Sequence, residues 1–192
     1  MSSPEEQTGF SDTDRWALRV IAQQSIAHGV RHARPLAVDP LEFSPLLRAP
    51  AASFVTLRRA AQLRGCVGSL DVERPLIADV AHNAFAAAFH DPRFPPVADH
   101  ELEDLTLSIS VLSPWERIVG STRAEVEAQI RVGLDGVVLT VAALRATLLP
   151  SMWDRVSDAG TFLDLLLHKA NLPRDYWSQE LEFWRYTTET VQ

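Results

Sequence analysis

The stretch SFVTLRRAAQLRGCVGSL, residues 53–70, decides the fold. Its first five residues and the run from Leu63 to Leu70 are rich in apolar and β-branched side chains, which predicts two strands joined as a hairpin. The turn, RAAQ at 59–62, lacks the glycine or asparagine that two-residue hairpin loops favour. A hairpin of this kind is an element of an antiparallel sheet.

The second strand of this hairpin carries the only cysteine of the chain, Cys66, two residues after Arg64. Because side chains alternate along a strand, Arg64 and Cys66 are expected on one face, where the guanidinium would favour the reactive thiolate. Gly65 and Gly68 leave room for a ligand or another backbone. The alternative is that Cys66 is a packed apolar side chain and the glycines mark a bulge or a crowded strand crossing.

Further helices and strands are predicted on both sides of the hairpin. A helix is expected from a capping box at Ser11 and Asp14 to Gly29, with Trp16 on its apolar stripe. Other segments are a proline-rich connection at 31–50, helices at 75–89, 122–132 and 161–171 (the last from a Thr161 and Asp164 box), and strands at 105–111, 137–141, 146–149 and 183–188. Without regular alternation of strands and helices, this order predicts an α+β fold with a mostly antiparallel sheet and flanking helices.

Composition restricts the function classes. A chain of 192 residues fits one domain or two small lobes, and a formal net charge of -7 argues against binding to nucleic acid. A single cysteine cannot form an intramolecular disulfide, and no stretch is long and apolar enough to cross a membrane. The start, MSSPEE at 1–6, is acidic and polar where a secretory signal would be basic and then apolar, so we expect a cytoplasmic soluble protein. Residues 1–10 are expected to be disordered.

Histidine and acidic clusters offer weaker chemistry. His82 is predicted to lie with Asp79 and Asn83 on the less apolar side of the 75–89 helix, where it could activate Cys66 or simply face solvent. The acidic run at 100–104 matches no metal-ligand spacing and is interpreted as a solvated helix start or turn. No phosphate-binding glycine loop is present, so no cofactor or metal is expected.

Several segments together resemble the AMMECR-type domain, whose bacterial and archaeal members are called AmmeMemoRadiSam system protein A. They are FVTL (54–57), LRGCVGSL (63–70), RPL (74–76), NA (83–84), AAAF (86–89), DPRF (91–94), SISVL (108–112), LDG (134–136) and LP (149–150). The resemblance runs from about residue 10 to the end and is most specific in the Arg-Gly-Cys-x-Gly segment.

The resemblance implies a single two-lobed α+β domain over residues 11–192, with the Arg-Gly-Cys segment near the cleft between the lobes. It implies two partners, a Memo-type protein similar in fold to extradiol dioxygenases and a radical SAM protein. It supplies no reaction, because the molecular activity of the family is not established. Asn83 belongs to the family pattern, whereas His82 does not.

Two functions follow from this reading. In the first, the chain is an enzyme component that binds a small molecule or peptide, with Cys66 as nucleophile or thiolate ligand and Arg64 as its activating cation. Asn83, together with Asp91 or Arg93, would orient the bound molecule. In the second, the chain is a non-catalytic adaptor or regulatory protein that uses the same cleft to dock a peptide, a metabolite or the Memo-type partner.

Overall fold

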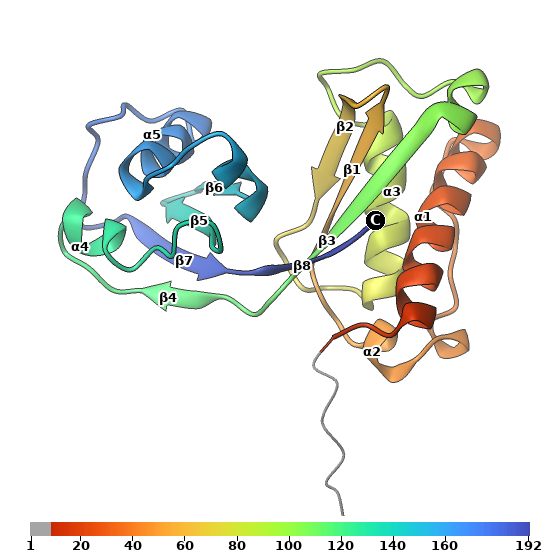
Figure 1. The fold of residues 1–192 in the computed structure, drawn as a ribbon, viewed down its shortest axis with the longest axis horizontal. Helices are drawn as coiled ribbons and strands as arrows, with labels where there is room; N and C mark the ends of the chain where they lie inside the picture. The colour runs from red at the N-terminus through yellow and green to blue at the C-terminus, as the bar shows by residue number, and fades with distance from the viewer. Residues whose placement is uncertain (1–8) are drawn as a thin grey trace, which may run out of the picture. The chain divides into compact units, whose positions relative to one another are not determined.

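The computed structural model describes residues 9–192, which form helices and two four-stranded sheets (Figure 1). Every strand pairing that is described residue by residue is antiparallel, so the predicted α+β class is confirmed. The chain divides into two compact units: unit 2 comprises Ser113–Thr188, and unit 1 comprises the residues before it together with Glu189–Gln192. The disorder expected for residues 1–10 concerns a segment that, apart from Gly9 and Phe10, lies outside the described residues.

The secondary structure follows the order predicted from the sequence, with additions. Unit 1 contains α1 (Asp12–His32), η1 (Pro40–Glu42), α2 (Pro45–Arg48), β1 (Ser53–Arg59), β2 (Gln62–Gly68), α3 (Leu76–Phe89), η2 (Asp99–Asp104), β3 (Leu105–Leu112) and most of β8 (Thr188–Val191), where η denotes a 3-10 helix. Unit 2 contains β4 (Glu116–Ile118), α4 (Arg123–Glu127), β5 (Gly136–Val141), β6 (Leu144–Leu148), η3 (Pro150–Asp154), α5 (Ala159–Lys169) and β7 (Glu182–Tyr186). Among the described helices, none combines the length and apolarity needed to span a bilayer.

The core of unit 1 lies between its sheet and the helices α1 and α3. The strand order is β2-β1-β3-β8, and Figure 1 shows both helices beside this sheet. Alternate side chains of the strands, including Val55, Leu57 and Ile109, are fully buried and belong to one apolar cluster with residues of both helices. The alternation of apolar and hydroxyl residues in β3 therefore predicted its core face correctly, and the hydroxyl side chains lie on the opposite face.

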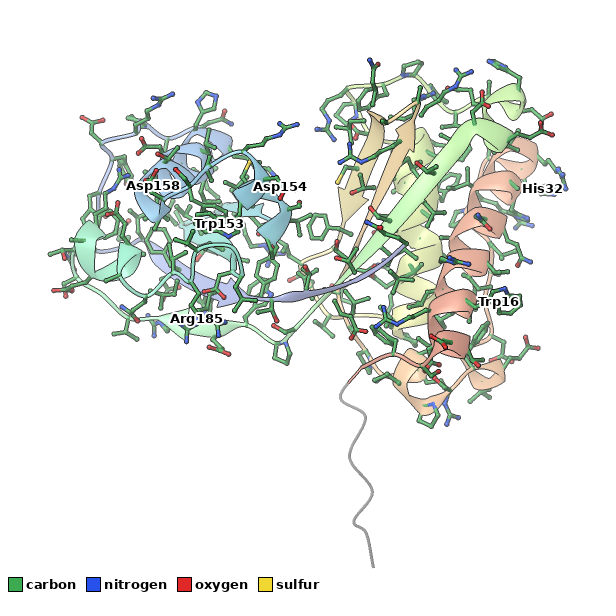
Figure 2. The ribbon with its side chains drawn as sticks, in the orientation of Figure 1. Trp16, His32, Trp153, Asp154, Asp158 and Arg185 are labelled. Carbon is green, nitrogen blue, oxygen red and sulfur yellow. The ribbon has the colours of Figure 1, made fainter. Side chains whose placement is uncertain are left out.

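Helix α1 begins as the sequence predicts but ends later. The Ser11 hydroxyl accepts a hydrogen bond from the Asp14 amide (3.1 Å), which completes the expected capping box. The helix continues past Gly29 to His32, so this glycine does not mark the end of the helix. It allows close packing instead, because a Cβ there would lie 2.3 Å from the ring of Phe89 on α3. Trp16 is not on the buried stripe, since it is 60% exposed and projects from the helix (Figure 2).

Unit 2 has its own apolar core, formed by side chains of α5 and of a sheet with the strand order β4-β7-β5-β6. Helix α5 packs on this sheet through Phe162, on which Trp153 of η3 stacks with ring centroids 4.3 Å apart (Figure 2 labels Trp153). The predicted cap at Thr161 is wrong: Asp158 caps the helix by accepting the Thr161 amide (2.8 Å). Helix α4 is also shorter than the predicted 122–132.

Candidate functional site

Cys66 lies on the face of the unit 1 sheet opposite the core. Its register partner on β1 is Thr56, which pairs in turn with Ser108 on β3, so a thiol and two hydroxyls form one row across three strands. Thr56 Oγ1 and Cys66 Sγ share a hydrogen bond at 3.3 Å. The residue as a whole is half-buried.

The backbone of Cys66 is held by an ion pair. Strand β2 is an edge strand, so it has no neighbouring strand on one side to accept its amide hydrogen bonds. The Cys66 amide donates to Asp91 Oδ2 (2.8 Å) instead. Arg93 donates to both carboxylate oxygens of Asp91 (2.9 and 2.6 Å) and to the Cys66 carbonyl (3.4 Å). These hydrogen bonds from Arg93, with that of the Cys66 amide, lower the pKa of the Asp91 carboxyl to about 2.

Arg93 is the cation that contacts Cys66, through a hydrogen bond to its backbone carbonyl. The hydrogen bonds of Arg93 to Asp91 raise the pKa of the Arg93 guanidinium. The Asp91 side chain is only 3% exposed, but that of Arg93 is 54% exposed. The Arg93 guanidinium is therefore fixed by a buried carboxylate and still accessible to a ligand.

Arg64 is directed away from the thiol. The β1–β2 register shifts between Leu57 and Arg58, which pair with Gly65 and Leu63, so Arg64 is the extra residue of a bulge. An extra residue breaks the simple alternation that would place Arg64 and Cys66 on one face. The Arg64 guanidinium instead binds a carboxylate on η2.

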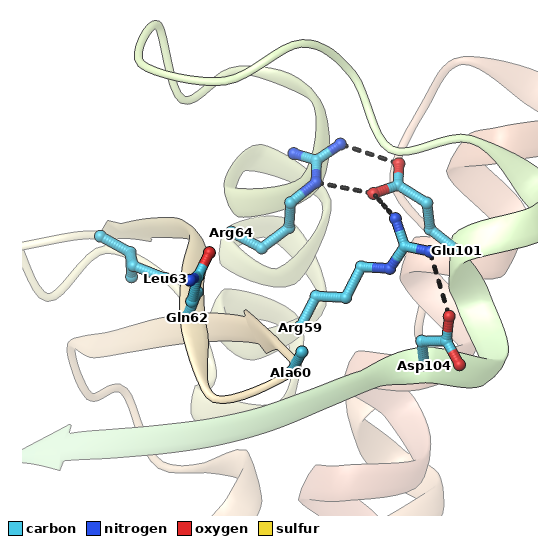
Figure 3. A pocket seen from close by; sticks show the side chains of 7 residues that line it. All are labelled: Arg59, Ala60, Gln62, Leu63, Arg64, Glu101 and Asp104. Carbon is cyan, nitrogen blue, oxygen red and sulfur yellow. Dashed lines mark hydrogen bonds and ion pairs between the residues drawn. The ribbon is translucent and has the colours of Figure 1, made fainter.

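That carboxylate belongs to Glu101, which Arg64 contacts through Nε (2.8 Å) and Nη2 (2.9 Å) as shown in Figure 3. The two side chains are 12% and 9% exposed, so this is a largely buried pair with two parallel hydrogen bonds. The Arg64 hydrogen bonds, and secondarily the Ala98 amide, lower the pKa of Glu101 to about 2. Arg59 adds single contacts to Glu101 (3.5 Å) and to Asp104 (3.1 Å).

These charged groups border an open groove of about 730 Å³ at the tip of the β1–β2 hairpin (Figure 3). We call it the hairpin groove; it is lined by Arg59, Ala60, Gln62, Leu63, Arg64, Glu101 and Asp104. Ala60 and Ala61 both have positive φ angles (48° and 63°) in the two-residue turn. The backbone therefore adopts the conformation that the missing asparagine and glycine would have favoured.

Asn83 belongs to a different cluster. It is 2% exposed, and its amide donates to Asp79 Oδ2 (2.8 Å) and to the Ser53 carbonyl (3.0 Å), which ties α3 to β1. Burial raises the pKa of Asp79, while hydrogen bonds from Ser53 and Ser69 oppose this effect. The expectation of a solvated helix face is thus wrong for Asp79 and Asn83, and only His82 of this group is exposed.

The space beside both glycines is filled by the protein itself. A Cβ on Gly65 would lie 2.0 Å from the carbonyl oxygen of Ala87 on α3. A Cβ on Gly68 would lie 2.2 Å from the ring of Phe54 and 2.5 Å from the Ser53 carbonyl. This geometry agrees with the crowded-crossing alternative, because backbone and ring atoms occupy the volume that a ligand would need.

Sequence reasoning missed two contributors to these arrangements. Thr56 faces the thiol, and the cross-strand register needed to find it cannot be read from one strand alone. Glu101 was grouped with an acidic run interpreted as solvated, although it is buried against Arg64. Within residues 9–192, no three histidine, cysteine or acidic side chains are grouped so that they could hold a metal ion.

Comparison with known proteins agrees with this architecture. The AMMECR1 family model matches residues 19–191. A protein of Methanothermobacter thermautotrophicus is 34% identical over 171 residues, covering 88% of each chain, and one of Thermotoga maritima is 32% identical over 91% of this chain and 94% of its own. The crystal structure of an uncharacterized protein from Pyrococcus horikoshii superposes with a TM-score of 0.83 at 30% identity, covering 92% of this chain and 89% of that one. With the family model matching nearly the whole described chain and relatives at this level of identity, the protein belongs to the AMMECR1 family.

Proposed function

We propose that the chain is a ligand-binding enzyme component in which Cys66 reacts with, or coordinates, a small molecule that carries an anionic group. The observation that carries this proposal is the half-exposed Arg93 guanidinium, which Asp91 holds in place and which donates a hydrogen bond to the backbone carbonyl of Cys66, the residue with the only thiol of the chain. Arg93 takes the activating role that the sequence suggested for Arg64, because the Arg64 guanidinium is bound to Glu101.

The surroundings of Cys66 hold the residue in a defined position beside a cation. The Thr56 hydroxyl lies 3.3 Å from Cys66 Sγ, and the Arg93 guanidinium donates to the Cys66 carbonyl (3.4 Å). Asp91 accepts a hydrogen bond from the Cys66 amide, and Arg93 donates one to the Cys66 carbonyl. These two hydrogen bonds restrain the backbone of Cys66 and therefore the position of its Sγ atom. A positioned thiolate beside a cation is suited to attack on an electrophile whose own negative charge binds the cation.

The competing adaptor function would use a docking surface instead of thiol chemistry. An exposed apolar segment could serve such docking, but in the stretch from Leu149 to Trp153 both Met152 and Trp153 pack against the unit 2 core, where Trp153 stacks on Phe162 and donates to the Asp135 carbonyl (2.7 Å). This packing gives Trp153 a structural role. Association with a Memo-type or a radical SAM protein stays a prediction, which a pull-down with each purified partner would test.

Two alkylating reagents of similar size test the thiol proposal. Iodoacetate is anionic and iodoacetamide is neutral, so the ratio of their second-order rate constants for Cys66 reports the charge that the approaching reagent meets. A unit charge at about 6 Å changes the energy of an approaching anion by roughly 0.7 kcal/mol when water screens it, or about threefold in rate. We expect Arg93→Gln to lower the iodoacetate rate at least about threefold more than the iodoacetamide rate.

Two variants complete the experiment. Arg93→Lys keeps the charge and should restore most of the iodoacetate rate, whereas Arg48→Gln removes an exposed arginine of α2 and should leave both rates unchanged. Circular dichroism at the assay temperature checks that each variant is folded. Equal slowing of the two reagents by Arg93→Gln, or no alkylation of Cys66 in the folded protein, contradicts the proposal.

A further inference from the structure

We propose that the hairpin groove is a separate binding site, for a small molecule that joins a carboxylate to a short aliphatic group. The site lies at the tip of the β1–β2 hairpin against η2 and does not include Cys66. Its volume of about 730 Å³ is within the range of small-molecule pockets, roughly 300–1,000 Å³.

The first argument is an excess of hydrogen-bond donors. Each guanidinium has five N–H groups, and in the described residues Arg64 Nη1 is a buried side-chain atom without a hydrogen-bond partner. Glu101 already accepts from Arg64, Arg59 and the Ala98 amide, so its oxygens are committed. The accessible donor is Arg59, which is 41% exposed and makes one contact to Glu101 (3.5 Å) and one to Asp104 (3.1 Å), so a ligand that brings acceptor oxygens can bind its guanidinium.

The second argument is the charge that the groove accepts. Two arginines face two carboxylates there, and Asp104 is the weakly held one: it is 61% exposed and pairs with Arg59 at 3.1 Å. Such an exposed pair contributes about 1 kcal/mol or less, so a ligand carboxylate can displace Asp104 from Arg59 at small cost. A doubly charged phosphate would meet the fixed charge of Glu101, which favours a monoanion.

The third argument is the apolar part of the lining. Leu63, whose side chain is 38% exposed, and the methyl group of Ala60 border the same groove as the arginines. A ligand anchored on Arg59 by its carboxylate can therefore bury an aliphatic group against Leu63. Both kinds of contact together select a carboxylate with a short alkyl chain over a purely polar ion.

The test is an NMR titration of the ¹⁵N-labelled protein with sodium pentanoate. We expect saturable shifts confined to the amides of residues 59–64 and 101–104. Pentanamide, which has the same alkyl chain without the charge, and inorganic phosphate, which has charge without the chain, should produce no saturable shifts. Saturation by pentanamide or phosphate as tight as that by pentanoate, or no saturation by pentanoate, overturns the proposal.

Arg59→Gln is the informative variant, because Arg59 is 41% exposed and makes only single contacts. Loss of a charged hydrogen-bond donor should weaken pentanoate binding about tenfold. Arg48→Gln should bind as the unmodified protein does, and so should Cys66→Ser, which separates this site from the thiol site. Unchanged affinity in Arg59→Gln, or lost affinity in Cys66→Ser, refutes the assignment.

Discussion

Glu101 provides a quantitative test of the buried ion pair. Replacement by glutamine keeps the size of the side chain but removes the charge that Arg64 Nε and Nη2 contact. The Arg64 guanidinium is then 12% exposed without a counter-charge, and breaking a buried pair in this way typically costs about 3–5 kcal/mol. We expect Glu101→Gln to lower the free energy of unfolding at pH 7 by about 3 kcal/mol.

The pH dependence gives the same magnitude independently. Folding lowers the pKa of Glu101 from 4.5 to about 2, which corresponds to roughly 3 kcal/mol of stability at neutral pH. Because the pKa is lower in the folded state, this stability is present above pH 4.5 and is lost as the pH falls toward 2. Relative to pH 7, protonation of Glu101 lowers the free energy of unfolding by about 1 kcal/mol at pH 4 and by about 2 kcal/mol at pH 3.

The assay is urea unfolding, followed by circular dichroism, at pH 7, 4 and 3 for the unmodified protein and for Glu101→Gln. The difference between their unfolding free energies should shrink from pH 7 to pH 3, since the carboxyl of the unmodified protein becomes protonated. Glu103→Gln, an exposed change in the same short helix, serves as the matched control and should shift stability by less than about 0.5 kcal/mol. A difference that is constant between pH 7 and pH 3 would refute the reasoning.

Three further changes test the packing. Gly65→Ala should destabilise the protein by about 3 kcal/mol or more in urea unfolding, because the new Cβ would lie 2.0 Å from the Ala87 carbonyl oxygen; a neutral effect would mean that β2 and α3 are further apart. Ala61→Gly should stabilise by about 1 kcal/mol, since φ is 63°, and a lower melting temperature would contradict the turn geometry. Asn83→Leu should cost about 2–3 kcal/mol, because Asp79 and the Ser53 carbonyl lose a buried donor; unchanged stability would argue against the network.

Local patterns predicted most of the secondary structure because they depend on neighbours in sequence. The Ser11 capping box and the alternation in β3 each need only a few consecutive residues to be recognised. The end of α1 was misplaced because Gly29 fits a tertiary contact with Phe89, which helix-ending statistics do not contain. The fold class could therefore be predicted, while helix ends that depend on packing could not.

The site was predicted less well, for a geometric reason. The inference that Arg64 and Cys66 share a face assumed unbroken alternation, and one extra residue in β2 removes that relation. Cys66, Asp91 and Arg93 do lie together, whereas Asn83 joins Asp79 in another cluster. A bulge in β2 and a buried network around Asn83, both invisible in a single sequence, decide which of the predicted residues meet.

The position of β8 has a consequence for synthesis on the ribosome. Unit 2 is continuous in sequence and can fold as it emerges, but the sheet of unit 1 has β8 as its outer strand beside β3. Val191 enters the unit 1 core, and Glu189 pairs with Arg15 of α1. During translation, the edge of β3 in the nascent unit 1 therefore stays unpaired, and open to wrong strands, until β8 (Thr188–Val191) has left the exit tunnel.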